Sequence, residues 1–248
     1  MKTLATYSIK GGVGKTTAAV NLAYAASRAG ARVLVWDLDP QGAATFFCRV
    51  KQGFEGGAER LVGGHGELAR HARECDVAGV HLVPADFSLR HLDLHLDDAG
   101  RARRRLTGLL EPVASAYDVA VLDCPAGITL ASETVFRAAD ALLVPTIPTP
   151  LSVRTLHQLV AFLSGVDADR RPAVWPFVSM FDWRKAMHRE LLAELAHSEP
   201  PFFATAVPTS SAIERMGRLR QPVGQASPRT TAARAYQHLW DEIAARLW

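Results

Sequence analysis

Short apolar runs alternate with longer stretches of helix-forming residues along almost the whole chain. The apolar runs predict strands at residues 4–9, 32–36, 80–84, 119–122, 141–144 and 173–178. The stretches between and after them predict helices at residues 16–29, 106–116, 131–138, 152–163, 188–197, 210–218 and 230–247. Several strands are apolar at nearly every position, which is typical of strands covered on both faces. The alternation therefore predicts an α/β fold, a doubly wound and mostly parallel sheet with helices on both faces.

One section of the chain, residues 52–66, is rich in glycine and weakly patterned. We expect a surface loop with short helical pieces there. The arginine run at residues 101–105 is typical of a solvated face at the start of a helix. No linker rich in Pro, Ser and Gly divides the sequence, so we predict a single domain over residues 1–248.

Composition places the chain among globular proteins, with 48% hydrophobic and 21% charged residues. The formal net charge of +3 permits a nucleic-acid surface but does not require one. The cysteines Cys48, Cys75 and Cys124 show no C-x-x-C spacing, which argues against a disulfide framework, a zinc site or an iron–sulfur centre. No signal peptide fits the first residues, and no apolar run approaches the roughly 18 residues of a membrane span. The sequence therefore predicts a cytoplasmic protein.

The most specific motif is K-G-G-V-G-K-T-T at residues 10–17, between a predicted strand and a predicted helix. A glycine loop in this position lets successive backbone N–H groups and the helix N-terminus surround a nucleotide phosphate. Lys15 would reach the β- and γ-phosphate oxygens, and the Thr16 hydroxyl would ligate Mg²⁺. The residues predicted to bind the phosphates are Gly11, Gly12, Val13, Gly14, Lys15, Thr16 and Thr17.

This loop departs from the common G-x-x-x-x-G-K-[ST] pattern in two places. Ile9 stands where the common pattern has its first glycine, and Lys10 adds a second lysine ahead of the glycine pair. Two cations suit a γ-phosphate that carries charge in the transition state, and Lys10 could act within its own subunit or across a dimer. The alternative is a solvated loop lysine.

Three aspartates follow apolar strands. Asp37 and Asp39 end the strand at residues 32–36, and Asp123 ends the strand at residues 119–122. Ligands lie at the carboxyl ends of parallel strands, so one of the first two carboxylates can orient the attacking water while the other supports Mg²⁺. Asp123 has the position of a Walker B acid, which holds Mg²⁺ directly or through water. Without the glycine loop upstream, these carboxylates could equally be strand-end turns.

On these motifs, together with D-L-D-P-Q-G at residues 37–42 and V-L-D-C-P-A-G at residues 121–127, the chain resembles the ParA/MinD family of deviant Walker-A ATPases. It looks closest to the short ParA type. The resemblance implies a P-loop fold with ATP and Mg²⁺ as cofactors. It also implies that Lys10 contacts nucleotide in an ATP-bound dimer, that Asp39 positions the water and that Asp37 lies near the metal. Pro208 falls where the family's C-terminal loop packs on adenine.

The resemblance further implies an ATPase that is slow alone, dimerises on binding ATP, binds DNA non-specifically and is stimulated by a ParB-like or cargo-adaptor partner. Such a protein positions or segregates a plasmid, a chromosome or a protein assembly, and we expect it to associate with the nucleoid. Basic residues that could bind a DNA backbone are Arg184, Lys185, Arg189, Arg215, Arg218 and Arg220. Arginines that serve only solubility are the alternative.

A second alternative is a MinD-like, membrane-associated positioning ATPase. Such a protein attaches through an amphipathic helix, and residues 238–248 are amphipathic and end in Trp248. We expect instead that this helix closes the domain and that the protein does not bind a membrane.

Overall fold

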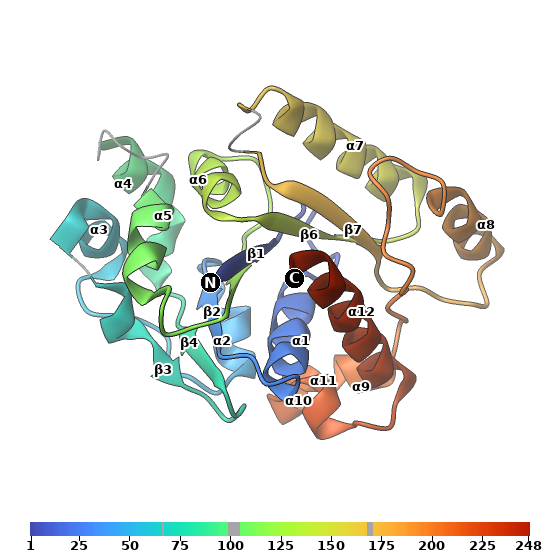
Figure 1. The fold of residues 1–248 in the computed structure, drawn as a ribbon, viewed down its shortest axis with the longest axis horizontal. Coiled ribbons are helices and arrows are strands. Elements are labelled where there is room, and N and C mark those ends of the chain that lie inside the picture. Colours follow the sequence, from blue (N-terminus) through green and yellow to red (C-terminus); the bar gives the residue numbers. More distant parts are fainter. Residues whose placement is uncertain (66, 99–104, 168–170) are drawn as a thin grey trace.

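A seven-stranded sheet organises the chain, for which the computed structural model describes residues 1–65, 67–98, 105–167 and 171–248 (Figure 1). The strands run, from edge to edge, in the order β3 (Arg73–Glu74), β4 (Val80–Val83), β2 (Val33–Asp37), β5 (Val119–Asp123), β1 (Lys2–Thr6), β6 (Ala141–Thr146) and β7 (Ala173–Val178). The short edge strand β3 is antiparallel to β4, and the other neighbours are parallel. The predicted doubly wound, mostly parallel sheet is confirmed.

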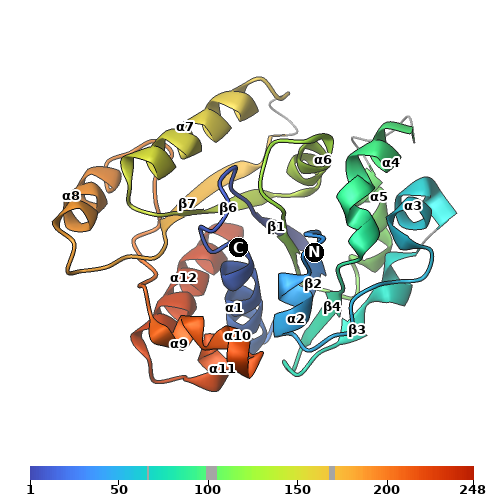
Figure 2. The same ribbon diagram turned by 180° about the vertical axis from the view of Figure 1, so that it is seen from behind.

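Both faces of this sheet are covered by helices. Successive residues of each strand point to opposite sides, so each strand contributes side chains to an apolar cluster on either face. Val33 and Val35 pack into one apolar cluster, whereas Leu34 and Trp36 pack into the other. The first face carries α1 (Lys15–Arg28), α2 (Ala43–Phe47), α9 (Ser211–Glu214), α10 (Met216–Leu219), α11 (Val223–Ala226) and α12 (Thr231–Leu247). The second face carries α3 (Gly57–Arg60), α4 (Leu92–Asp98), α5 (Arg105–Leu110), α6 (Leu130–Ala138) and α7 (Pro150–Ser164). Figure 2 shows the two layers from behind, with α8 (Ala186–Leu195) beyond the β7 edge.

Local sequence explains several helix boundaries. Pro150 stands at the start of α7, where its missing N–H is not needed. Thr230 caps α12 by accepting a hydrogen bond from the Ala233 N–H at 3.3 Å. The apolar side of α12, including Trp240 and Ile243, is buried in the first cluster. The amphipathic pattern of this helix is therefore accounted for by packing within the chain, and no described helix has both the length and the apolar character needed to span a membrane.

Some predicted elements differ from those observed. The first strand ends at Thr6 rather than residue 9, because the chain leaves the sheet there to form the glycine loop. The helix predicted at residues 106–116 is α5 followed by a 3₁₀ turn, Glu111–Val113. The helix predicted at residues 210–218 is divided into α9 and α10.

Other short elements were not predicted as such. They are β3, α2, α4, α11 and the 3₁₀ turns Leu68–His71 and Phe87–His91. Residues 52–66 contain short helical pieces, as expected, namely α3 and a π-helical turn, Leu61–His65. They do not lie wholly on the surface, because Ala58 and Leu61 are buried in the core. The arginines at positions 101–104 lie outside the described residues. Cys48, Cys75 and Cys124 are all free thiols.

Candidate functional site

The glycine loop joins β1 to α1 at the carboxyl edge of the sheet, and its shape depends on two glycines with left-handed backbone. Gly12 has φ 72° and Gly14 has φ 97°. A Cβ at Gly14 would lie 3.2 Å from Ser179 Oγ and 3.7 Å from the Met180 methyl carbon, so this position has neither the conformation nor the space for a side chain. The loop is therefore pressed against the end of β7.

Ser179 supports the loop directly. Its buried hydroxyl donates a 3.0 Å hydrogen bond to the carbonyl oxygen of Val13. Sequence inspection did not identify this residue, since a single serine after an apolar strand carries no distinctive signal. The bond holds the loop by a carbonyl oxygen and uses none of its N–H groups, which are the groups that can bind an anion.

Lys15 opens α1 from inside the site and is only 8% exposed. Desolvation by burial lowers the pKa of its ammonium group, while the nearby Asp123, Cys124 and Asp39 act in the opposite direction. Among the residues that the structure describes, no side chain caps the N-terminus of α1. The buried cation and the open helix N-terminus together favour a strongly anionic ligand.

Asp37 and Asp123 are fully buried and stand side by side, because they pair in register at the ends of β2 and β5. Burial raises the pKa of Asp37 to about 6 and that of Asp123 well above its usual range. The Asp37 carboxylate further raises the pKa of Asp123, and the Asp39 carboxylate raises the pKa of both. The Asp37 carboxylate accepts hydrogen bonds from the Thr45 N–H at 2.8 Å and the Thr45 hydroxyl at 2.7 Å. Thr45 is a second residue that sequence inspection missed.

Asp123 is less well satisfied. Its Oδ1 accepts a 3.3 Å hydrogen bond from the Thr6 hydroxyl, and the nearby Thr16 hydroxyl lowers its pKa. Its Oδ2 is buried without a hydrogen-bond partner in the described chain. Two buried carboxylates with an unsatisfied oxygen fit a bound cation. Within the described ranges, no three His, Cys, Asp or Glu side chains form a metal site on their own.

Asp39 and Lys10 lie at the same edge and are partly exposed. The Asp39 N–H donates to Asp37 Oδ1 at 3.2 Å, and Asp39 Oδ1 accepts a 2.9 Å hydrogen bond from the Gln41 N–H. The Lys10 N–H donates to Ser8 Oγ at 3.3 Å, and its ammonium group makes no ion pair with the part of the chain that the structure describes. Asp39 thus sits on a turn beside the buried carboxylate, and Lys10 is available for an external ligand.

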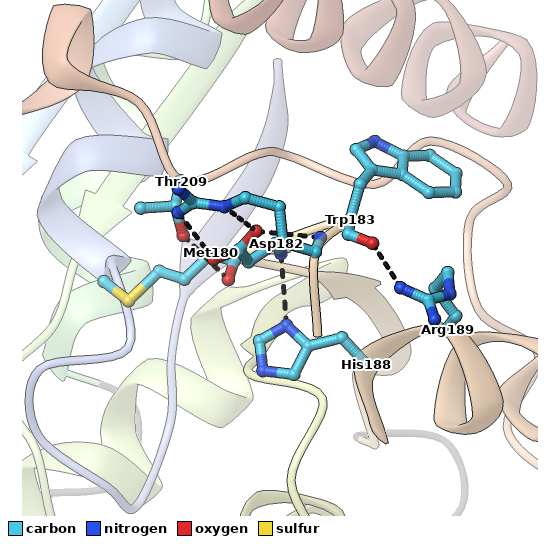
Figure 3. A network of polar contacts seen from close by, with 7 residues as sticks. Met180, Asp182, Trp183, His188, Arg189 and Thr209 are labelled. Atoms are coloured by element: carbon cyan, nitrogen blue, oxygen red, sulfur yellow. Dashed lines mark hydrogen bonds and ion pairs between the residues drawn. The ribbon is translucent and has the colours of Figure 1, made fainter. Parts of the chain in front are cut away.

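Pro208 belongs to a segment that extends the sheet past β7. It forms a parallel bridge with Phe181, and Thr209 Oγ1 donates to the Met180 carbonyl oxygen at 3.0 Å (Figure 3). Met180 in turn lies against Gly14. The segment predicted to contact adenine is therefore linked to the phosphate loop through one residue.

The candidate DNA contacts form two separate groups. Near the start of α8, Arg184 is exposed but pairs with Asp182 at 2.9 Å, and Arg189 Nη1 donates to the Trp183 carbonyl oxygen at 2.5 Å (Figure 3). Lys185 is exposed at the N-cap of α8.

The second group lies between α9 and α10 (Arg215), on α10 (Arg218) and directly after α10 (Arg220), and its members differ in their contacts. Arg215 and Arg218 are exposed and make no ion pair among the described residues. Arg220 differs, because its Nε donates to the Phe46 carbonyl oxygen at 2.9 Å and its guanidinium lies 4.5 Å from the centre of the Phe46 ring. Its side chain is thus engaged within the chain.

The chain is similar to known proteins in both sequence and fold. A family profile described as "AAA domain" matches residues 1–174. The chromosome-partitioning ATPase Soj of Thermus thermophilus is 32% identical over 242 residues, which cover 96% of this chain and 93% of Soj. Among solved structures, an ATP complex of a McdA variant from Cyanothece superposes with a TM-score of 0.84 at 22% identity, covering 98% of this chain and 96% of that one.

A further structural relative is more similar in sequence. Cobyrinic acid a,c-diamide synthase from Mycobacterium smegmatis, with a bound ATP analogue and magnesium, has a TM-score of 0.82 at 25% identity. The match covers 98% of this chain and 94% of that one. The fold is thus shared over nearly the whole length.

Proposed function

The chain belongs to the ParA/MinD family of deviant Walker-A ATPases, and we propose that it is a ParA-type ATPase that binds ATP with Mg²⁺ and hydrolyses it slowly when alone. The observation that carries the proposal is the meeting of a glycine loop, a buried lysine and two buried, mutually repelling carboxylates at one sheet edge. Similarity to a partitioning ATPase and to nucleotide complexes supports the same interpretation. We treat residues 1–248 as one domain, because one sheet receives strands from both halves of the chain.

Each residue of the site has a distinct task in this proposal. The loop N–H groups of residues 11–17 and the Lys15 ammonium hold the phosphates, and the Thr16 hydroxyl, Asp123 and Asp37 hold Mg²⁺ directly or through water. When bound, Mg²⁺ neutralises charge on the β- and γ-phosphate oxygens. The Asp39 carboxylate orients the attacking water, which is chiefly a matter of position in phosphoryl transfer.

Lys10 and Pro208 extend the site beyond the phosphates. We propose that Lys10 reaches the nucleotide when two subunits close face to face, since it is partly exposed and makes no ion pair with the described chain. Pro208 packs on adenine, because its segment is linked to Gly14 through Met180. ATP-dependent dimerisation is the expected consequence.

DNA binding follows from the exposed basic residues around α8, α9 and α10. Lys185, Arg189, Arg215 and Arg218 would contact phosphates without reading sequence, and Arg184 would do so while paired to Asp182. A monomer offers few such contacts and a dimer doubles them, so ATP would switch DNA affinity through valence. A ParB-like or cargo-adaptor partner would stimulate hydrolysis and release the dimer from DNA. The proposal thus describes a cytoplasmic protein whose ATP-bound dimer associates with the nucleoid.

Two variants test the proposal. Lys15→Gln should prevent stable binding of Mg²⁺–ATP in calorimetry, because it removes the buried phosphate ligand. Asp39→Ala should bind ATP normally, hydrolyse it at least about tenfold more slowly and keep the dimer on DNA. Wild-type hydrolysis by Asp39→Ala would refute its water-positioning role.

A third variant addresses the dimer. Lys10→Ala should leave nucleotide binding by the monomer intact and abolish the ATP-dependent dimer in light scattering. Unchanged dimers would refute the cross-subunit role. Absence of any heat with wild-type protein and Mg²⁺–ATP would reject the proposed function as a whole.

A further inference from the structure

Among the residues that the structure describes, three that are not glycine have a left-handed backbone conformation. Arg49, Met180 and Arg220 have φ of 56°, 54° and 52°. Left-handed backbone is unfavourable for residues with a Cβ and persists only where surrounding contacts impose it. All three residues lie where the segment of residues 208–220 contacts the elements around the phosphate loop and the carboxylates. Strain held at these junctions indicates that they have a functional role.

At one junction, each of two arginines with left-handed backbone donates a hydrogen bond to the chain segment that precedes the other. Arg220 Nε donates to the Phe46 carbonyl oxygen at 2.9 Å, and Arg49 Nη2 donates to the Leu219 carbonyl oxygen at 2.8 Å. The Arg220 guanidinium also lies over the Phe46 ring, and Arg49 Nη1 pairs with Asp76 at 3.2 Å. We refer to Arg49, Arg220 and the two carbonyl groups that they bind as the arginine clasp.

The clasp joins the carboxylate side of the site to the basic helices. Phe46 belongs to α2, where the neighbouring Thr45 donates two hydrogen bonds to Asp37. Leu219 ends α10, which follows Arg215 and carries Arg218. The Asp37–Thr45 pair is therefore connected to α10 through one short helix.

The other junction fixes the beginning of the same segment. Thr209 donates its N–H to the Phe181 carbonyl oxygen at 2.8 Å and its hydroxyl to the Met180 carbonyl oxygen. Strained Met180 rests against Gly14 of the phosphate loop. The segment that holds α9 and α10 is thus tied at one end to the loop and at the other to the carboxylates.

We propose that the arginine clasp couples occupancy of the phosphate site to the position of α9 and α10, with Arg49 and Arg220 as positioning residues. In this assignment Arg220 holds the basic helices in place instead of contacting DNA. Hydrogen bonds and packed side chains that have two arrangements can carry such coupling, and the clasp supplies the link that connects α2 to α10. The inference rests on the proposed nucleotide binding, and only its second readout depends on DNA.

The first experiment measures backbone amide exchange of residues 211–220 with and without Mg²⁺ and the β,γ-imido analogue of ATP. In the wild-type protein, nucleotide should change the exchange rates of these amides at least about fivefold. Arg49→Ala and Arg220→Ala should lose that response while retaining wild-type nucleotide affinity in calorimetry. Arg154→Ala, an exposed arginine on α7, makes the same change of charge and should keep the response.

The second experiment measures DNA affinity with the ATP analogue and with ADP. The dissociation constant for DNA with ADP, divided by that with the ATP analogue, gives a ratio that should fall at least about fivefold in the clasp variants and stay unchanged in Arg154→Ala. Arg220→Lys, which keeps the charge but not the Nε–H, should lose the ratio like Arg220→Ala and guards against misfolding of the alanine variant. A simple DNA contact would instead weaken both affinities equally in Arg220→Ala and would be partly restored by lysine.

The outcomes separate the two proposals. If wild-type protein binds no nucleotide, the proposed function fails. If wild-type protein binds nucleotide and its DNA affinity depends on nucleotide, but both clasp variants show the same dependence and the same amide exchange as the wild type, the clasp proposal is overturned. If the amides of residues 211–220 respond only with an intact clasp and DNA does not bind, the clasp stands and the DNA proposal fails.

Discussion

Substitution of the loop glycines by alanine gives a graded test of the site geometry. Gly11 has no positive φ, and a Cβ added there would meet no atom within 4 Å, so Gly11→Ala should change the stability by no more than about 0.5 kcal/mol. Gly12 has equally open space but φ 72°, so alanine there should destabilise by about 1 kcal/mol through backbone strain alone. Gly14 combines φ 97° with a contact 3.2 Å from Ser179 Oγ. Displacing Ser179 also weakens its hydrogen bond to Val13, so Gly14→Ala should destabilise by about 2–3 kcal/mol.

The measurement is urea unfolding of nucleotide-free protein, followed by circular dichroism, with the m-value checked for each variant. Stability should fall in the order Gly11→Ala, Gly12→Ala, Gly14→Ala. Ser179→Ala in the Gly14→Ala background should lower the combined loss below the sum of the two single losses, because the contact and the hydrogen bond are shared. Equal losses for Gly11→Ala and Gly14→Ala would refute the reasoning.

Three further predictions concern buried polar groups. Because burial raises the pKa of Asp37 to about 6, the folded protein binds more protons than the unfolded one between about pH 4 and pH 6. Stability without ligand should therefore fall as pH rises through this window, by up to about 3 kcal/mol relative to Asp37→Asn, and parallel pH profiles in urea unfolding would contradict this. Asn21 accepts a 2.8 Å hydrogen bond from the buried Val223 N–H, so Asn21→Ala should lose about 2 kcal/mol of unfolding free energy; a loss below about 0.5 kcal/mol would argue against it. Asp123→Asn removes one of two adjacent buried carboxylates, so it should stabilise the unliganded protein at pH 7. It should also weaken Mg²⁺-dependent ATP binding at least about tenfold in calorimetry, and unchanged binding would show that Asp123 does not belong to the cation site.

Much of the site was accessible from sequence because its chemistry is local. Lys10, Lys15 and Thr16 lie in one uninterrupted loop, where glycine spacing alone specifies how the backbone can bend. The positions of Asp37 and Asp123 also followed, since parallel strands joined by helices bring their carboxyl ends to one edge. The alternation of apolar runs and helical stretches was sufficient for the fold class, whereas the short elements α2, α3 and α11 lie below the length at which periodicity is informative.

The contacts that fix the positions of these residues could be seen only in the tertiary structure. Ser179 supports Val13, Thr45 binds Asp37, and Arg49 and Arg220 clasp each other's turns across large separations in the chain. Pairing of β2 with β5 makes two carboxylates immediate neighbours and thereby creates the buried charge that favours a bound cation. The sequence by itself determined the order of strands and helices along the chain and the place of the glycine loop between β1 and α1, because those depend on neighbours within a few positions. Which buried groups share a contact depended on strand pairing and packing over the whole chain, for which no short pattern carries a signal.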